Sequence, residues 1–131
     1  MSELSDADLL AQALSARERS YSPYSGYAVG AALLAASGAV FEGTNVENAS
    51  YGLSVCAERV ATFKAVDAGE RAFTKIAIAG APGVPCSPCG ACRQVLYEFA
   101  PDLDVIMGTG AASFDKATLK ELLPRGFGFS R

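Results

Sequence analysis

The stretch that organises the chain runs from residue 73 to residue 99 and reads FTKIAIAG (73–80), APGVP (81–85) and CSPCGACRQVLYEF (86–99). Its first part is short and apolar around Ile76 and Ile78, which predicts a buried strand. Its last part, 89–99, has the three- and four-residue spacing of a helix, at Cys92, Val95, Leu96 and Phe99. Pro88 suits the start of that helix. We therefore expect a strand, a Pro/Gly loop and a helix, with three cysteines where the loop meets the helix.

The flanking sequence alternates between helical and β patterns. A first helix is predicted to be capped by Ser5 and to run to about Arg19. The other predicted elements are strands at 27–35 and 39–46 around a Ser37-Gly38 turn, a helix at 55–68 that Ser54 is placed to cap, a strand at 104–107, a further strand around Phe114, and a helix at 118–123 that Pro124 stops. This order predicts an α/β protein, a three-layer αβα sandwich with a mixed sheet.

Composition limits the classes of function. The 131 residues, half of them apolar, fit a single domain over 1–131. The net charge of -3 argues against a nucleic-acid partner, and the absence of histidine leaves proton transfer to Glu, Asp and Cys. The acidic N-terminus has no secretory pattern and the longest apolar stretch, 28–36, is too short for a bilayer, so we expect no membrane contact and a cytoplasmic location.

The cysteines indicate a metal site. Cys86, Cys89 and Cys92 are three positions apart, and Cys56 falls in the first turn of the predicted 55–68 helix. In a reducing compartment this spacing favours metal ligation over disulfides. Cys89 and Cys92 share a helix face and can chelate one zinc ion, with Cys56 supplied by the other helix. Three protein ligands leave one tetrahedral position to water, whose pKa zinc lowers from about 15.7 toward about 7.

Two charged residues follow Cys56. Glu58 is two positions further on, off the face of the ligand, so we expect it to transfer protons at the open position rather than to bind the ion. Three thiolates make a net negative zinc centre, and Arg59 and the two helix starts are candidates to withdraw that charge. One alternative stays open. If Cys86 also binds, the site is closed, and the chain is a non-catalytic zinc binding module built on four cysteines.

Five ordered motifs span nearly the whole sequence: SPYSGYAVGAAL (22–33), GTNVENAS (43–50), CAER (56–59), SPCGACRQ (87–94) and LLPRGF (122–127). With these motifs the chain resembles the small, homotetrameric-type cytidine deaminases. The general deaminase pattern is a ligand, any residue and Glu, followed later by Pro-Cys-x-x-Cys. The resemblance implies a cytidine deaminase-like fold, Zn²⁺ as cofactor, Cys56, Cys89 and Cys92 as ligands, and no zinc role for Cys86.

The resemblance also implies the chemistry. Zinc-bound hydroxide attacks C4 of free cytidine or 2′-deoxycytidine, and Glu58 carries protons from the water to N3 and to the departing ammonia. Asn45 and Glu47 are implied to hold the ribose hydroxyls, and the backbone at Ala57 and Ser87 to contact the pyrimidine edge. Arg59 is implied to donate to the ligand thiolates.

Two aromatic residues complete the implied substrate site. Tyr27 stands where relatives commonly have Phe beside the nucleoside, so its hydroxyl needs a partner or water. Phe127 matches an aromatic residue that covers the base bound by a neighbouring subunit. The resemblance therefore implies a homotetramer with composite active sites.

Other deaminase substrates remain as rivals. A deaminase of a modified nucleoside such as blasticidin S shares the fold and the metal pattern, but Asn45-Val-Glu47 favours a plain ribose. Polynucleotide editing uses the same chemistry, and the acidic balance argues against it. Pyrimidine salvage is the expected role.

Overall fold

A five-stranded mixed sheet forms the centre of the molecule. The computed structural model describes residues 4–80, 86–110 and 113–129. In sheet order the strands are β2 (Val40–Thr44), β1 (Gly30–Ala35), β3 (Phe73–Ala79), β4 (Asp104–Gly110) and β5 (Ser113–Thr118). The β3 and β4 strands are parallel, and the other neighbouring pairs are antiparallel. The parallel pair is the one that α3 (Gly90–Phe99) connects, because parallel neighbours need a crossover.

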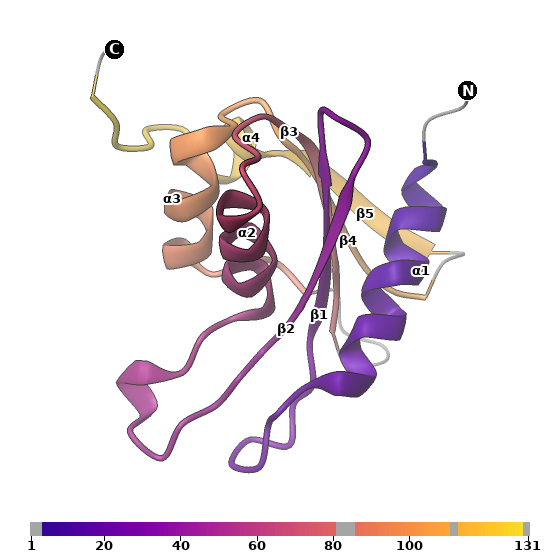
Figure 1. Ribbon diagram of the computed structural model, residues 1–131, viewed down its shortest axis with the longest axis vertical. Coiled ribbons are helices and arrows are strands. Elements are labelled where there is room, and N and C mark those ends of the chain that lie inside the picture. Colours follow the sequence, from indigo (N-terminus) through magenta and orange to yellow (C-terminus); the bar gives the residue numbers. More distant parts are fainter. Residues whose placement is uncertain (1–3, 81–85, 111–112, 130–131) are drawn as a thin grey trace.

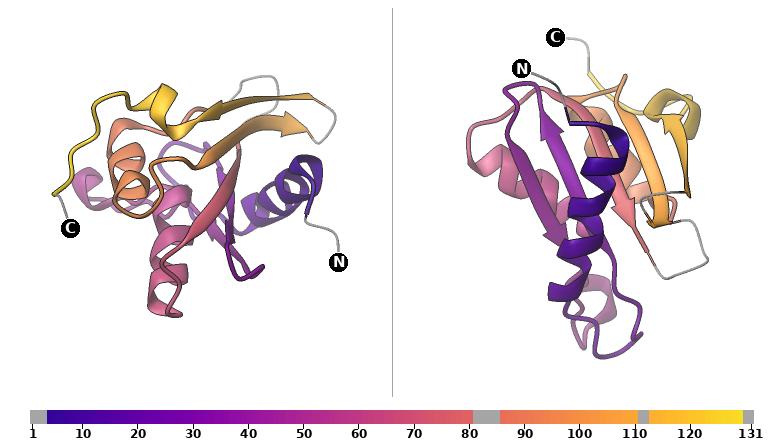
Figure 2. Two further views of the ribbon diagram at one scale, coloured as in Figure 1. Left: turned by 90° about the horizontal axis from the view of Figure 1, so that it is seen from above. Right: turned by 90° about the vertical axis from the view of Figure 1, so that its right-hand side faces the viewer.

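Helices cover both faces of the sheet (Figure 1). Helix α1 (Asp6–Ala16), continued by the 3-10 turn η1 (Arg17–Arg19), lies on one face. On the other face lie α2 (Ala57–Asp67) and α3, and the short α4 (Leu119–Leu122) packs into the same core layer (Figure 2). The predicted three-layer αβα sandwich is confirmed. None of the helices in the described ranges is long and apolar enough to cross a membrane.

Strand β1 explains why its sequence is apolar without interruption. Ala31 and Leu33 lie in the core under α2 and α3, whereas Ala32 and Leu34 lie in the core under α1. Successive strand side chains point to opposite faces, so a sheet covered on both sides buries every position. The run Gly30–Ala35 is accordingly buried throughout.

The starts of several elements differ from those predicted, most of all at β1 and α2. Strand β1 begins at Gly30 rather than at residue 27, because the preceding residues form a loop that is hydrogen-bonded to the Asn45 and Glu47 side chains. Helix α2 begins at Ala57, with Cys56 and not Ser54 at the N-cap. The chain is still extended at Val55, which pairs with Val46, so Ser54 lies too early to cap the helix. The Ser54 hydroxyl accepts the Asn48 amide instead, at 3.0 Å.

The predicted cap of α1 is correct, since Ser5 Oγ accepts the Asp8 amide at 3.0 Å. Helix α3 begins one residue later than predicted, at Gly90, and Cys89 is its N-cap. The strand predicted at 104–107 continues to Gly110, and the strand predicted around Phe114 is β5. These shifts leave the predicted order of elements unchanged.

Candidate metal centre and active site

Two helix starts bring cysteines together on one side of the sheet. Cys56 is the N-cap of α2 and Cys89 is the N-cap of α3, both with extended backbone conformations. Figure 1 shows these two helices side by side. A helix start carries unpaired N–H groups and partial positive charge, which stabilise a thiolate there.

A close contact between β2 and α2 sets the position of the first of these helix starts. A Cβ at Gly43 would lie 2.5 Å from both the Ala57 carbonyl oxygen and the Ala61 amide nitrogen. The strand can therefore approach the first turns of α2 only because residue 43 has no side chain. This approach holds Cys56 and Glu58 at the edge of the sheet.

The three predicted ligand thiols form a compact group. Cys56 Sγ lies 3.8 Å from Cys89 Sγ, and Cys89 Sγ lies 3.4 Å from Cys92 Sγ. All three sulfur atoms lie within 4.8 Å of one another. A tetrahedral zinc ion with Zn–S bonds of about 2.3 Å places its sulfur ligands about 3.8 Å apart. The spacing of the three sulfur atoms therefore fits a zinc ion. Cys86 is not a member of this group, so the four-cysteine alternative has no support in the geometry.

Hydrogen bonds favour the thiolate form at Cys56. The Cys92 thiol and the Arg59 guanidinium donate to Cys56 Sγ and lower the pKa of Cys56 to about 5. The distance from Arg59 Nη2 to that sulfur is 3.6 Å. The pKa of Cys92 is raised by the same hydrogen bond and by burial, so in this pair Cys56 ionises first. Arg59 lies where the sequence predicted a group that offsets thiolate charge.

Glu58 is a buried carboxyl beside the thiols. Glu58 lies in the first turn of α2 and is only 4% exposed. Acidic residues are rarely buried to this extent. Burial, and then the charge of Cys56, raise the pKa of Glu58 to about 7. A carboxyl with such a pKa can both accept and release a proton near neutral pH.

A pocket of about 290 Å³ opens onto this centre. Its volume is at the lower end of the range for small-molecule sites. It is lined by two of the predicted ligand thiols, by Glu58, by five of the six predicted substrate contacts, by Cys86, and by two residues that the sequence did not single out: Cys56, Cys89, Glu58, Tyr27, Asn45, Glu47, Ala57, Ser87, Cys86, Ser25 and Val29. The SPYSG motif (22–26) was the available sequence signal for Ser25.

The Asn45 and Glu47 side chains have structural partners in addition to lining the pocket. Asn45 Nδ2 donates to the Tyr27 carbonyl at 2.8 Å, and Asn45 Oδ1 accepts the Val29 amide at 2.9 Å. Glu47 Oε1 accepts the Tyr24 and Ser25 amides at 2.9 and 3.1 Å. The sequence analysis did not predict these bonds. The two side chains therefore shape the loop that forms one wall of the pocket.

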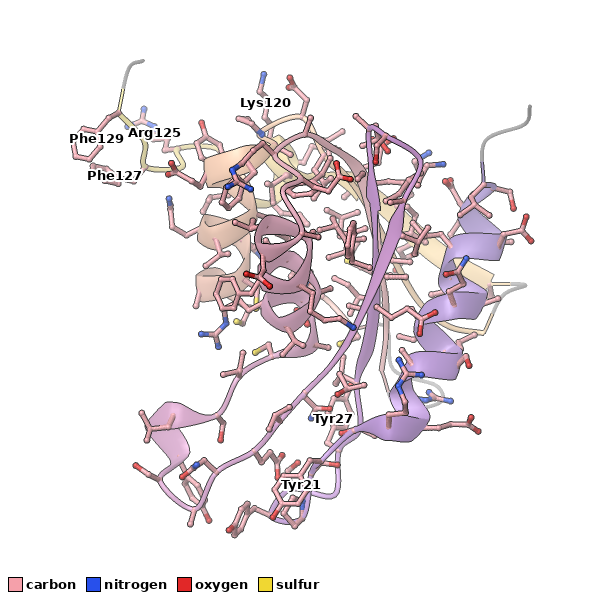
Figure 3. All side chains as sticks on the ribbon, in the orientation of Figure 1. Tyr21, Tyr27, Lys120, Arg125, Phe127 and Phe129 are labelled. Carbon is pink, nitrogen blue, oxygen red and sulfur yellow. The ribbon has the colours of Figure 1, made fainter. Side chains whose placement is uncertain are left out.

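Phe127 is the predicted contact that does not line the pocket. Its ring is exposed, at 65%, and packs edge-on against Phe129. Figure 3 shows both rings far from Tyr27. The Gln94 side chain on α3 holds the backbone of Phe127 in both directions, donating to its carbonyl at 2.7 Å and accepting its amide at 3.1 Å. The sequence did not predict this role of Gln94.

Known proteins are similar to this chain in sequence and in fold. Residues 4–109 match the family described as "Cytidine and deoxycytidylate deaminase zinc-binding region". The chain is 48% identical over 120 residues to the cytidine deaminase of Halalkalibacterium halodurans, and the match covers 91% of each chain. A crystal structure of cytidine deaminase from Burkholderia pseudomallei has a TM-score of 0.87 and 48% identity, over 91% of this chain and 96% of that one. The structure of cytidine deaminase from Mycobacterium tuberculosis has a TM-score of 0.80 and 38% identity, over 92% and 95%.

Proposed function

The chain belongs to the family of zinc-dependent cytidine deaminases, and from that membership we propose that it hydrolyses free cytidine and 2′-deoxycytidine to uridine and 2′-deoxyuridine, with release of ammonia. One observation carries the proposal for this site. Three thiols spaced for zinc lie beside a buried carboxyl in a pocket of small-molecule size.

The residues then divide the work of the reaction. Cys56, Cys89 and Cys92 would hold the zinc ion, which would supply a nucleophile from water at neutral pH. Glu58 accepts the proton that this water loses as its oxygen attacks C4, and delivers it to N3 of the ring. It then carries the second proton of the water to the exocyclic nitrogen, which leaves as ammonia. Water and cytidine thus become uridine and ammonia with all protons accounted for.

The rest of the pocket binds the substrate. The backbone at Ala57 and Ser87 contacts the pyrimidine edge, and the Tyr27 ring forms a wall beside the nucleoside. Asn45 and Glu47 receive the ribose hydroxyls. A carboxylate offers about four acceptor sites, so Glu47 can accept a hydroxyl while it still binds the Ser25 amide.

Replacement of the carboxyl tests the assignment. Glu58→Gln removes the proton carrier and leaves the three thiols in place, so we expect stoichiometric zinc and a turnover of cytidine lowered by about 10²- to 10⁴-fold. Ammonia release and loss of the cytidine absorbance band measure turnover, and Glu18→Gln, an exposed site on η1, is the matched control.

Two outcomes of that assay contradict the proposal. Unchanged turnover in Glu58→Gln removes Glu58 as the proton carrier. If the wild-type protein releases no ammonia from cytidine or deoxycytidine, the substrate is wrong. Release from adenosine or blasticidin S in the same panel then identifies the alternative.

We further propose a homotetramer with composite active sites. Phe127 supports this, since its ring is exposed and does not line the pocket of its own chain. Exposed Tyr24 and Tyr51 beside that pocket are a surface that a second copy can cover. Light scattering of the purified protein tests the assembly, and a monomeric mass contradicts it.

The cellular role follows from the substrate. A free nucleoside as substrate implies pyrimidine salvage in the cytoplasm, where reducing conditions keep the zinc-binding thiols available. The cysteines in the described ranges are all free of disulfides, which is the state this role requires. Fractionation of cells tests the location, and activity recovered outside the cytoplasmic fraction contradicts it.

A further inference from the structure

Three residues from separate segments meet at the pocket wall. Tyr27 lies in the loop before β1, Gly80 follows β3, and Cys86 precedes α3. A Cβ at Gly80 would lie 2.5 Å from the Tyr27 hydroxyl oxygen, 2.7 Å from Cys86 Cβ and 3.2 Å from Cys86 Sγ. The hydroxyl and the thiol therefore converge on the space that the missing side chain leaves.

Cys86 accepts a hydrogen bond from the Tyr27 hydroxyl. The thiol is partly buried and is not a member of the Cys56, Cys89 and Cys92 group, so the metal centre gives it no role. A phenolic hydroxyl packed against other protein atoms needs a hydrogen-bond partner, and the sulfur supplies one. The Tyr27 hydroxyl thus has the hydrogen-bond partner whose identity the sequence left open.

The backbone at Gly80 is itself anchored. Arg17 Nη1 donates to the Gly80 carbonyl, and the adjacent Ala79 is paired with Gly30 in the sheet. The backbone that bounds the space around the hydroxyl is therefore held in position. The position of this backbone matters for the pocket, because Tyr27 lines the pocket together with Asn45 and Glu47.

We propose that Gly80 and Cys86 are positioning residues, which seat the Tyr27 hydroxyl at the pocket wall and thereby set the orientation of its ring against the nucleoside. Gly80 supplies the room and Cys86 supplies the acceptor. The inference rests on the proposed function for its readout in catalysis. It assigns to Cys86 a role in substrate binding in place of a role in zinc binding.

A mutant cycle on the hydrogen bond tests the proposal. Cys86→Ala leaves the hydroxyl without its acceptor, and we expect KM for cytidine to rise at least about fivefold, equivalent to about 1 kcal/mol, with kcat and zinc content retained. Cys86→Ser restores an acceptor and is expected to restore KM. In a Tyr27→Phe background the hydroxyl is gone, so Cys86→Ala is expected to leave KM unchanged.

Gly80→Ala tests the space independently. Its Cβ would meet the Tyr27 hydroxyl, so we expect a rise in KM that Tyr27→Phe reduces, with the contact to Cys86 Cβ accounting for the remainder. Gly52→Ala is the matched control, since a Cβ there has no atom within 4 Å.

The opposite results overturn the inference. Equal effects of Cys86→Ala in the wild-type and Tyr27→Phe backgrounds show that the two side chains are not coupled, and loss of zinc in Cys86→Ser shows that the thiol is a ligand. The urea unfolding midpoints of the same variants measure the Tyr27–Cys86 coupling without any substrate. If the wild-type protein does not turn over cytidine, the proposed function fails, while these midpoints still decide whether the hydroxyl is seated as inferred.

Discussion

Arg59 shows how a single side chain can serve the charge of a metal centre. Its Nη2 donates to Cys56 Sγ at 3.6 Å, and its hydrogen bonds to Cys56 and Cys92 raise its own pKa. Three thiolates and one Zn²⁺ carry a net charge of about -1, which a guanidinium offsets. Because thiolates reduce the Lewis acidity of zinc, a donor to the sulfur also favours the reaction.

Loss of that donor is expected to loosen the metal. Arg59→Gln removes the positive charge next to Cys56, and we predict zinc affinity lowered by about 10- to 100-fold. Competition with a colorimetric chelator measures it. Arg71→Gln is a control at an exposed arginine that bonds to backbone carbonyls and not to sulfur. Equal chelator sensitivity in the two variants would show that Arg59 does not stabilise the thiolates.

At the residue scale, sequence spacing predicted Cys56, Cys89 and Cys92 as a group of ligands but left open whether Cys86 joins it. Cys86, Cys89 and Cys92 are evenly spaced, so Cys86 relates to Cys89 as Cys89 relates to Cys92. Only Cys89 and Cys92 lie at the start of α3, because the helix begins at Gly90. The start of α3 therefore decides that Cys89 and Cys92 join Cys56, whereas Cys86 meets Tyr27.

At the scale of elements, the packing of β2 against α2 connects the sheet to the metal centre. The contact depends on Gly43, which lies against the backbone at Ala57 and Ala61. Those atoms belong to helix backbone, so they cannot rotate away as a flexible side chain can. Any side chain at 43 must shift the first turns of α2.

Gly43→Ala is accordingly predicted to disturb both stability and the metal site. We expect the free energy of unfolding to fall by about 1–3 kcal/mol, because the added methyl overpacks a closed interface. Zinc affinity is expected to fall with it, since Cys56 is the N-cap of the shifted helix. Urea unfolding and zinc titration measure the two effects, and a Gly43→Ala protein with the stability of Gly52→Ala would refute the packing argument.

Helix and strand patterns predicted the elements well and their starts less well. The apolar periodicity that defines α2 and α3 depends on residues within one helix, so it can be found in the sequence. The cap of α2 depends on the pairing of Val55 with Val46, which delays the helix past Ser54. A contact between segments therefore overrode a favourable capping residue.

At the scale of the whole molecule, Asp6 ties the outer helix to the sheet. Its carboxylate binds Lys75 on β3 at 2.9 Å and Lys116 on β5 at 3.0 Å. Hydrogen bonds to Lys75 and then Lys116 hold the pKa of Asp6 below its usual value of 3.8. A carboxyl with a lowered pKa in the folded state stabilises the fold above its unfolded pKa, and this contribution is lost as the pH falls below about 4.

Asp6→Asn is predicted to lower the free energy of unfolding at pH 7 by about 1 kcal/mol or less, because the pair is partly solvated. The difference from wild type is expected to shrink as the pH is lowered from 7 toward 2, because the wild-type carboxyl takes up a proton as the solution becomes acidic. Urea unfolding at the two pH values measures it, with Asp8→Asn, in the same helical turn, as the control for helix-dipole effects. A difference that persists unchanged at low pH would assign the effect to packing.

Patterns in the sequence were enough to predict the αβα architecture, the candidate set of cysteines, Glu58 as the candidate proton carrier and the resemblance to cytidine deaminases. These depend on periodicity and short spacings, which are properties of neighbouring residues. The tertiary structure alone decided that Cys86 meets Tyr27 and Gly80 rather than the thiol group, and that Asn45 and Glu47 also hold the loop at 20–29. Those contacts join segments far apart in the chain, and only the packing of the sheet and helices brings such segments together.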